Sequence, residues 1–184
     1  MLVEPHGGKL VNRVVKGDKK RELLAKVNQM AQLKLSLRDL IEAENIAIGL
    51  YNPLEGFMTE EDYNKVVEDM HLASGVAWTI PVVLGVSKEE ADQLRIGEDV
   101  ALTDQEGKVY AVLHLANKYT YDQQKEAELV YKTTESEHPG VANLYQRGEI
   151  LLGGKIYLVR RINHQLFNQY RLDPKDVREH IKNK

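Results

Sequence analysis

The clearest pattern of apolar and polar positions lies within residues 43–75. Apolar residues recur there at the i, i+3, i+4 and i+7 spacing of one helical face, at Tyr63, Val66, Val67 and Met70. Thr59 can cap such a helix, and Asp62 follows in the place of the acid of a capping box. We predict a helix that begins after Thr59 and buries this face in the core.

A turn comes directly before this helix, in residues 51–58. Pro53 fixes its own φ, and Gly56 can adopt the positive φ that other residues resist. Both flanks of the turn are apolar. Because turns often carry binding sites, this stretch is the first candidate place for function.

Five more helices are predicted from residues that can cap a helix N-terminus. These caps are Asp18, Ser36, Ser87, Asp122 and Asp173, the last followed by Pro174. We expect the first helix to run as far as Met30 and the third to Arg95. His138-Pro139-Gly140 is expected to end regular structure after the fourth.

Strand signals alternate irregularly with these helices. The apolar run 78–86 predicts a strand buried on both faces. Residues 99–103 and 109–118 flank a polar turn and predict a hairpin, and a second hairpin is predicted around Gly153-Gly154. The fold class is therefore α+β, with a small, mainly antiparallel β-barrel or curled sheet and several surrounding helices.

Composition and charge narrow the classes of function. A chain of 184 residues can form one large domain, or one domain with an appendage. The net charge of −3 argues against a nucleic-acid or anionic-membrane surface. The sequence holds no Cys, which excludes disulfides and thiolate sites. It shows no secretory signal and no long apolar run, so we expect a cytoplasmic protein with no membrane partner.

No stretch has the spacing of a catalytic or metal-binding motif. The six histidines include no pair at i, i+3 or i, i+4, so neighbouring helical turns cannot share a metal. His114 lies in a predicted strand and is expected to be structural. Gly7-Gly8 lacks the spacing of a P-loop and is expected to be a plain turn. The acidic groups fall at helix starts, where negative charge favours the helix dipole.

Two small basic groups could contact phosphate, but groups of this size are usually solvated surface. The first basic group is Lys16, Lys19, Lys20 and Arg21, and the second is Arg160-Arg161. Aromatic residues are too sparse around them to predict an RNA-stacking platform.

Six stretches follow one another along the chain: PHGGKLVNR (5–13), NPLEGFM (52–58) with Asp62-Tyr63, IPVVLGV (80–86), EAELVYKTT (126–134) with HPGV (138–141), LLGGKI (151–156) and YRLDP (170–174). In this order they resemble the N-terminal part of sulfate adenylyltransferase (ATP sulfurylase). Each stretch alone is a weak signal. Their common order makes the resemblance specific, from about Pro5 to the last residue.

The resemblance implies a PUA-like N-terminal domain, followed in the family by an α/β catalytic domain. The family joins ATP and sulfate to give adenosine 5'-phosphosulfate and pyrophosphate, so ATP with magnesium is implied for the parent enzyme. The family's QxRNP, HxxH and GRD-type motifs are absent from this sequence. Gln146-Arg147 is followed by Gly148-Glu149, and Val141 stands where His138 would need a second histidine. We expect the chain alone to be inactive, with no catalytic, cofactor-binding or metal-binding residue.

These expectations define a domain organisation. Residues 1–165 are predicted to form the PUA-like domain, and 166–184 a linker and the start of a helix that leads into an absent catalytic domain. That catalytic domain is the expected partner, and a homo-oligomer of the full-length enzyme is left open. The surface that meets it is predicted at Asn52, Pro53, Leu54, Gly56 and Phe57.

Two alternatives stand beside this interpretation. The first is a free-standing PUA-like binding module for RNA, although the acidic balance makes nucleic acid an unexpected partner. The second is a scaffold that stabilises or oligomerises the full enzyme.

Overall fold

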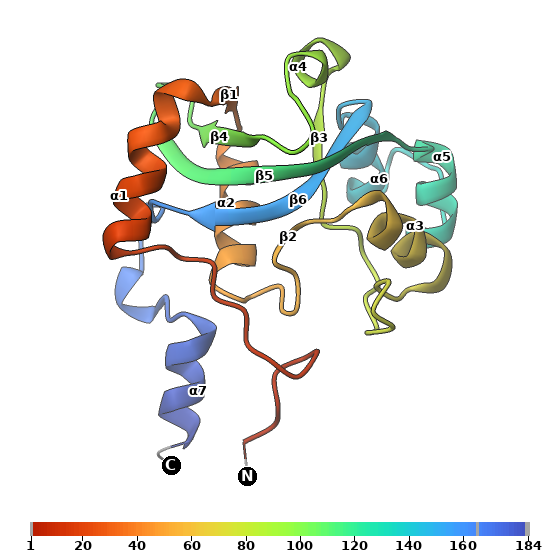
Figure 1. Ribbon diagram of the computed structural model, residues 1–184. Helices are drawn as coiled ribbons and strands as arrows, with labels where there is room; N and C mark the ends of the chain where they lie inside the picture. The colour runs from red at the N-terminus through yellow and green to blue at the C-terminus, as the bar shows by residue number, and fades with distance from the viewer. Residues whose placement is uncertain (1, 165, 183–184) are drawn as a thin grey trace. The chain divides into compact units, whose positions relative to one another are not determined.

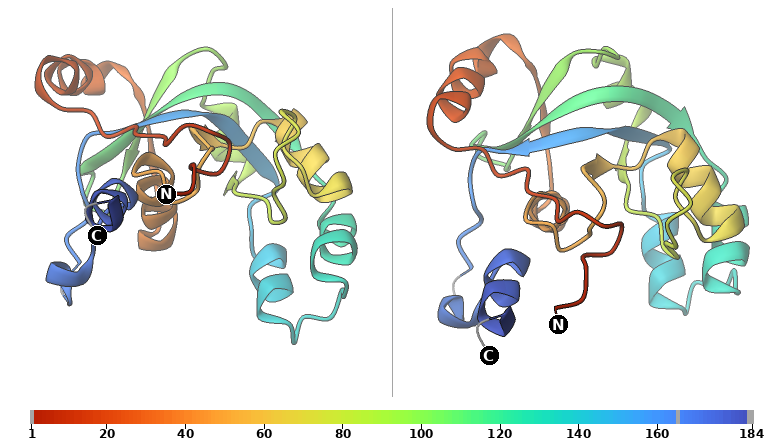
Figure 2. Two further views of the ribbon diagram at one scale, coloured as in Figure 1. Left: turned by 90° about the horizontal axis from the view of Figure 1, so that it is seen from below. Right: turned by 60° about the horizontal axis from the view of Figure 1, so that its bottom comes forward.

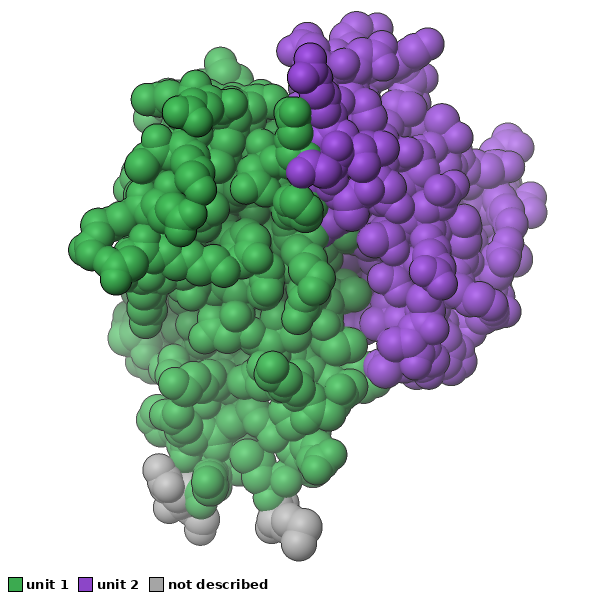
Figure 3. Space-filling view, in the orientation of Figure 1, with its two compact units in different colours: residues 1–57, 98–114, 155–184 green, residues 58–97, 115–154 purple. Residues whose placement is uncertain are grey.

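A computed structural model describes residues 2–164 and 166–182. The chain divides into two compact units, shown in green and purple in Figure 3. Unit 1 contains residues 1–57, 98–114 and 155–184, and unit 2 contains residues 58–97 and 115–154.

The β-strands form one mixed sheet (Figure 1). They are β1 (Ala31–Lys34), β2 (Gly56–Phe57), β3 (Leu84–Val86), β4 (Asp99–Thr103), β5 (Val109–Thr120) and β6 (Ile150–Leu158). Their order is β1-β4-β5-β6-β2, with β3 paired to β6. β1 and β4 are parallel, whereas β4 with β5 and β3 with β6 are antiparallel. The sheet is not closed, so of the two predicted forms the barrel is wrong, and the α+β class is confirmed.

Unit 1 contains three α-helices within its described residues. They are α1 (Gly17–Lys26), α2 (Leu37–Ala47) and α7 (Pro174–Lys182), with short 3₁₀ turns at Val27–Gln29 and Asn168–Tyr170. Ser36 caps α2 by accepting a hydrogen bond from the Asp39 N–H, as predicted. α2 buries Leu40, Ala43 and Ile46 almost completely and packs against β2. It is therefore the central core helix of this unit.

Unit 2 contains the remaining helices of the described chain. They are α3 (Glu60–Asp69), α4 (Lys88–Asp92), α5 (Gln123–Glu126), which continues as a π-helical turn (Ala127–Tyr131), and α6 (Pro139–Tyr145). Side chains of Thr59, Ser87 and Asp122 accept backbone hydrogen bonds at three of the N-termini, as predicted. Tyr63, Val66 and Val67 are buried. The sequence-based prediction for α3 is confirmed in its start and in most of its buried face.

Four predictions about where helices begin or end are wrong. α3 ends at Asp69, and Met70 takes a left-handed C-cap conformation with its side chain 39% exposed. α1 ends at Lys26 and has no side-chain cap, because Asp18 pairs with Arg21 inside the helix. α4 ends at Asp92, three residues before Arg95.

The fourth error concerns His138-Pro139-Gly140, which begins a helix instead of ending regular structure. The His138 Nδ1 accepts the Gly140 N–H at 3.1 Å, and so acts as the cap of α6. Pro139 stands in the first turn of this helix, where its missing N–H costs nothing.

Two strand predictions also fail. The predicted strand 78–86 is extended only at Leu84–Val86, and Ile80 within it is 53% exposed. The predicted second hairpin is one continuous strand, β6. A Cβ added at Gly153 would lie 2.6 Å from the Met58 carbonyl oxygen and would also meet Asn117 Oδ1. Gly153 therefore permits a close backbone approach within a strand, which is the other common use of glycine.

The hairpin of β4 and β5 is confirmed. Asp99 pairs with His114 and Leu102 with Ala111 across it, and Gly107 in its turn has φ +82°. Gly56, by contrast, lies in β2 and does not adopt the positive φ expected of it. The predicted domain boundary at residue 165 lies outside the described residues, as do Asn183 and Lys184.

Candidate interdomain surface

The turn before α3 is bound to the N-terminal segment through the side chain of Asn52. Its Oδ1 accepts the Val11 N–H at 2.6 Å, and its Nδ2 donates to the His6 carbonyl oxygen. A Cβ added at Gly7, which has φ +74°, would lie 2.7 Å from the Pro53 Cβ. Gly7 therefore serves close packing over Pro53, consistent with the plain turn predicted there.

Most of the five residues predicted to meet a catalytic domain are buried within unit 1. Asn52, Leu54 and Phe57 are 8%, 6% and 2% exposed, and Gly56 is also buried. Only Pro53 is half-buried. The interdomain role of this turn stays a prediction, and any direct contact there would depend on Pro53 and exposed neighbours such as Leu50.

A second feature joins the segment after β6 to α2 through the buried carboxylate of Glu44. Glu44 Oε1 accepts from Arg161 Nε at 2.7 Å and from the Ile162 N–H at 2.9 Å. Glu44 Oε2 lies 2.9 Å from His164 Nε2. Glu44 is 2% exposed, so its charge requires these partners.

Arg161 extends this network to the start of α7. Its two terminal nitrogens donate to the two oxygens of Asp173 at 2.8 and 2.9 Å. Hydrogen bonds to Asp173 and Glu44 hold the pKa of Arg161 above its ordinary value. We call Glu44, Arg161, His164 and Asp173 the Glu44 cluster, and it fastens the chain that precedes α7 onto α2.

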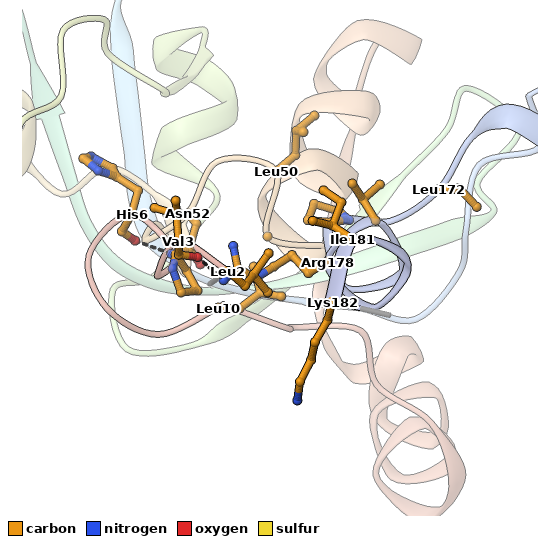
Figure 4. A pocket seen from close by; sticks show the side chains of 14 residues that line it. Leu2, Val3, His6, Leu10, Leu50, Asn52, Leu172, Arg178, Ile181 and Lys182 are labelled. Carbon is orange, nitrogen blue, oxygen red and sulfur yellow. Dashed lines mark hydrogen bonds between the residues drawn. The ribbon is translucent and has the colours of Figure 1, made fainter. Parts of the chain in front are cut away.

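A groove of about 990 Å³ lies between the N-terminal segment, the end of α2 and α7 (Figure 4). The close-up and both views of Figure 2 place α7 and residues 2–10 on the same side of unit 1. The lining of the groove is largely apolar. The apolar side chains are Leu2, Val3, Pro5, Leu10, Leu50, Leu172, Pro174, Val177 and Ile181, and the other lining residues are His6, Gly49, Asn52, Arg178 and Lys182. The Arg178 guanidinium donates to the Val3 carbonyl oxygen across it.

Basic side chains gather around Tyr157 on β6. Arg13 and Lys19 lie 4.2 and 4.1 Å from the ring centroid, and hydrogen bonding to Arg13 lowers the pKa of the Tyr157 phenol. Lys155 pairs with Glu55 at 2.7 Å and lowers the pKa of that carboxyl. Lys19 is the one member of the first predicted basic group that takes part in this cluster.

Unit 2 contains a buried ionic network around Glu126, which is 0% exposed. Arg147 Nη1 donates to its two oxygens at 3.1 and 2.9 Å, and the Tyr63 hydroxyl donates to Oε2 at 2.9 Å. Burial raises the pKa values of the Tyr63, Tyr119 and Tyr121 phenols above the ordinary value for tyrosine. The neutral Tyr63 phenol and the paired carboxylate thus connect α3 and α5 with the chain after α6.

Two of the residues considered as candidates from the sequence, His114 and Arg160, have structural contacts. His114 Nδ1 lies 2.9 Å from Asp99 Oδ1, as a cross-strand pair. Arg160 Nε donates to the Val109 carbonyl oxygen at 3.2 Å. Within residues 2–164 and 166–182, no three His, Cys, Asp or Glu side chains are grouped to hold a metal ion. No helix among them is long and apolar enough to cross a membrane.

Sequence reasoning missed both ionic networks. Glu44 and Arg161 stand 117 residues apart, and Glu126 and Arg147 stand 21 apart, so no local spacing connects them. The only signal was a charged residue inside an apolar helical pattern, as Glu44 is between Ala43 and Ile46. A charge at a core position indicates a distant partner but does not identify it.

The described residues form an α+β domain whose polar clusters connect its own elements. Residues 3–161 match the family model described as PUA-like domain. The chain therefore belongs to the PUA-like domain family, as expected from the resemblance.

Curated relatives carry the name sulfate adenylyltransferase. One from Halothermothrix orenii is 56% identical over all 184 residues, which cover 48% of that protein. One from Synechococcus sp. (strain JA-3-3Ab) is 45% identical over 96% of this chain, and the match covers 45% of the length of that protein. The chain thus spans about half the length of the curated relatives it matches.

A solved structure has the same fold. The hexameric APS kinase from Thiobacillus denitrificans superposes with a TM-score of 0.77 and 25% identity, over 100% of this chain and 32% of that one. In this neighbour too, the matching region is part of a longer chain.

Proposed function

We propose that this chain is the N-terminal, PUA-like domain of a sulfate adenylyltransferase, and that it has a structural and interdomain role. The carrying observation is the 56% identity over the whole chain to a sulfate adenylyltransferase of which it covers only 48%. The parent enzyme would join ATP, with magnesium, to sulfate, giving adenosine 5'-phosphosulfate and pyrophosphate. We further propose that the parent enzyme works in the cytoplasm.

The chemistry of the described residues supports an inactive domain. Adenylyl transfer depends on cationic groups, backbone donors and metal gathered around the phosphates. The strongest cationic contacts here serve the fold, because Arg147 is bound to Glu126 and Arg161 to Glu44 and Asp173. Two of the basic side chains near Tyr157, Arg13 and Lys155, already pair with the Glu55 carboxylate, whose negative charge would repel an anion.

The test is an assay of pyrophosphate-dependent ATP formation from adenosine 5'-phosphosulfate. The purified 184-residue chain should form no ATP above background. The same chain joined to the coding sequence that follows Lys184 in its gene should be active. Activity of the short chain would overturn the inactivity, and a following sequence with neither activity nor the QxRNP and HxxH motifs would overturn the assignment.

The partners follow from the same proposal. The remaining part of the same polypeptide is the first partner. The neighbour of known structure is described as hexameric, which supports a homo-oligomer of the full-length enzyme. Sedimentation velocity of the longer chain should then show a species larger than one copy.

A further inference from the structure

Unit 1 carries an exposed apolar surface along the groove beside α7. We define the α7 surface by Leu50, Leu172, Val177 and Ile181, which are 56%, 48%, 39% and 55% exposed. All four line the groove of about 990 Å³. Val177 and Ile181 are four residues apart, so they lie on the same face of the helix.

The surface is held in place by polar contacts on both sides. The Glu44 cluster fixes the chain before α7, because Arg161 binds both Glu44 and Asp173. The guanidinium of Arg178, one turn further along α7, donates to the Val3 carbonyl oxygen of the N-terminal segment. The apolar side chains are therefore presented by backbone whose position is already fixed, which lowers the entropy lost when a partner binds.

Exposed apolar side chains grouped in a groove and rimmed by charge are typical of a binding surface. The charged residues that line this groove are Arg178 and Lys182, both basic. A matching partner would present apolar side chains to the groove and carboxylates to its rim, since complementary charge fixes the orientation of docking.

The comparisons indicate which partner this is. The chain accounts for 48% and 45% of the two relatives described above, so a protein of that length has about as much chain again. In the proposed parent enzyme the remaining half follows α7 along the chain, so it is tethered beside this surface. A domain tethered there would meet the groove at a high effective concentration.

We propose that the α7 surface is the docking surface for the remaining half of the longer polypeptide. This rests on the proposed function for the identity of that half. It moves the main interdomain contact from the buried turn at 52–57 to Leu50, Leu172 and α7.

The 184 residues hold no cysteine, and peptide mapping by mass spectrometry follows each introduced thiol separately from any cysteine elsewhere in the longer chain. Single cysteines are introduced as Leu50→Cys and Ile181→Cys on the α7 surface. The matched controls are Leu37→Cys and Ile96→Cys, which replace a leucine and an isoleucine 64% and 57% exposed and outside the groove lining. The rate of alkylation by iodoacetamide is measured in the 184-residue chain and in the longer chain encoded by the gene.

In the 184-residue chain all four thiols should react at similar rates. In the longer chain the rates at positions 50 and 181 should fall at least tenfold, while those at 37 and 96 stay within twofold. Unchanged rates at 50 and 181 would overturn the proposal, and so would an equal fall at all four positions. A fall in the short chain as its concentration rises would mean that a second copy occupies the surface, which also overturns it.

The adenylyltransferase assay on the same longer chain separates the two proposals. An active longer chain with unprotected thiols would contradict the docking surface alone. An inactive longer chain without the family motifs would contradict the proposed function, whatever the labelling shows.

Discussion

The carboxylate of Glu126 is completely buried in unit 2, and two donors compensate for the loss of its hydration. Arg147 contributes the opposite charge and the Tyr63 hydroxyl a hydrogen bond. A buried ion pair of this kind adds little net stability compared with apolar packing, but removing one partner leaves an uncompensated charge. Loss of one partner of the pair should therefore lower the free energy of unfolding far more than the intact pair raises it.

Glu126→Gln should lower the free energy of unfolding by about 3–5 kcal/mol, because Arg147 keeps its charge in a site where its side chain is only 19% exposed. Urea unfolding followed by circular dichroism measures the change. Glu128→Gln, an exposed position two residues along the chain, is the control and should stay within about 0.5 kcal/mol of the parent. Equal effects of the two substitutions would contradict the structural role of the pair.

The buried tyrosines predict a loss of stability in alkali. Burial raises the pKa of Tyr63, Tyr119 and Tyr121 in the folded chain above the value of about 10 in the unfolded chain. The folded state then holds more protons above pH 10, so the free energy of unfolding falls as the pH rises past 10. Each tyrosine contributes a slope of at most about 1.4 kcal/mol per pH unit.

Tyr63→Phe should reduce this alkaline slope by one proton, which unfolding curves between pH 9 and pH 11 would measure. Tyr170→Phe is the control, because a ring 76% exposed is solvated in both states and should leave the slope unchanged. The explanation fails if Tyr63→Phe and the parent lose stability equally steeply above pH 10.

At the scale of single elements, the N-caps of four helices could be predicted from sequence. Ser36, Thr59 and Ser87 each accept a hydrogen bond from the backbone N–H three residues later, and Asp122 accepts from the N–H groups two and three residues later. The interaction is local, so its signal is contained in four consecutive residues. Helix ends were predicted less well, because the residues after Lys26 depend on distant packing: Val27 lies in a buried cluster with Ala101, Val109 and Val159.

Thr59→Ala should lower the free energy of unfolding by about 1 kcal/mol, since it leaves the Asp62 N–H without its acceptor. Thr79→Ala is the matched control, because Thr79 is exposed and lies outside helices and strands. Thermal unfolding of the two variants checks the difference. A loss as large in the control would show that the cap is not the cause.

The Glu44 cluster decides where α7 lies in unit 1. Glu44→Gln keeps the side-chain shape but removes the charge that binds Arg161 Nε and pairs with His164. We expect amide hydrogens of α7 to exchange at least about tenfold faster, a change of about 1.4 kcal/mol in local opening.

Glu22→Gln, which removes only an exposed ion pair with Lys26 on α1, should leave exchange in α7 unchanged. Protection in α7 that survives Glu44→Gln would show that the helix is held by its apolar contacts alone.

For the whole molecule, charge and resemblance point in the same direction. A net charge of −3 gives little attraction for a polyanion, and the curated relatives are named sulfate adenylyltransferase. We expect structured RNA to bind weakly at 50 mM salt, with no steep dependence on salt up to 200 mM. Fluorescence anisotropy of a labelled RNA hairpin measures this.

A log–log slope that reports several phosphate contacts would favour the RNA-binding alternative instead. Lys19→Glu, placed in the basic group around Tyr157, identifies the surface in that case. It should reduce the slope if RNA binds there, and it should change nothing if RNA does not bind.

The sequence by itself determined the features that depend on neighbouring residues. These are the caps of α2, α3 and α4, the β4–β5 hairpin with its glycine turn, and the α+β class. The ordered motifs also predicted membership of the PUA-like domain family, which the match over residues 3–161 confirms. Periodicity and capping are encoded within a few positions, so they can be recognised without a partner.

Only the tertiary structure decided what depends on distant contacts. Gly153-Gly154 has the composition of a turn, but it lies in one continuous strand, β6, which is held between β5 and β2 and approaches Met58 closely. Glu44 meets Arg161 across 117 residues, and that contact places α7 and its apolar surface. The turn at 52–57 is buried for the same reason, because Asn52 binds the N-terminal segment 41 residues away. Contacts between residues far apart in the chain leave no regular spacing in the sequence, so only the folded structure reveals them.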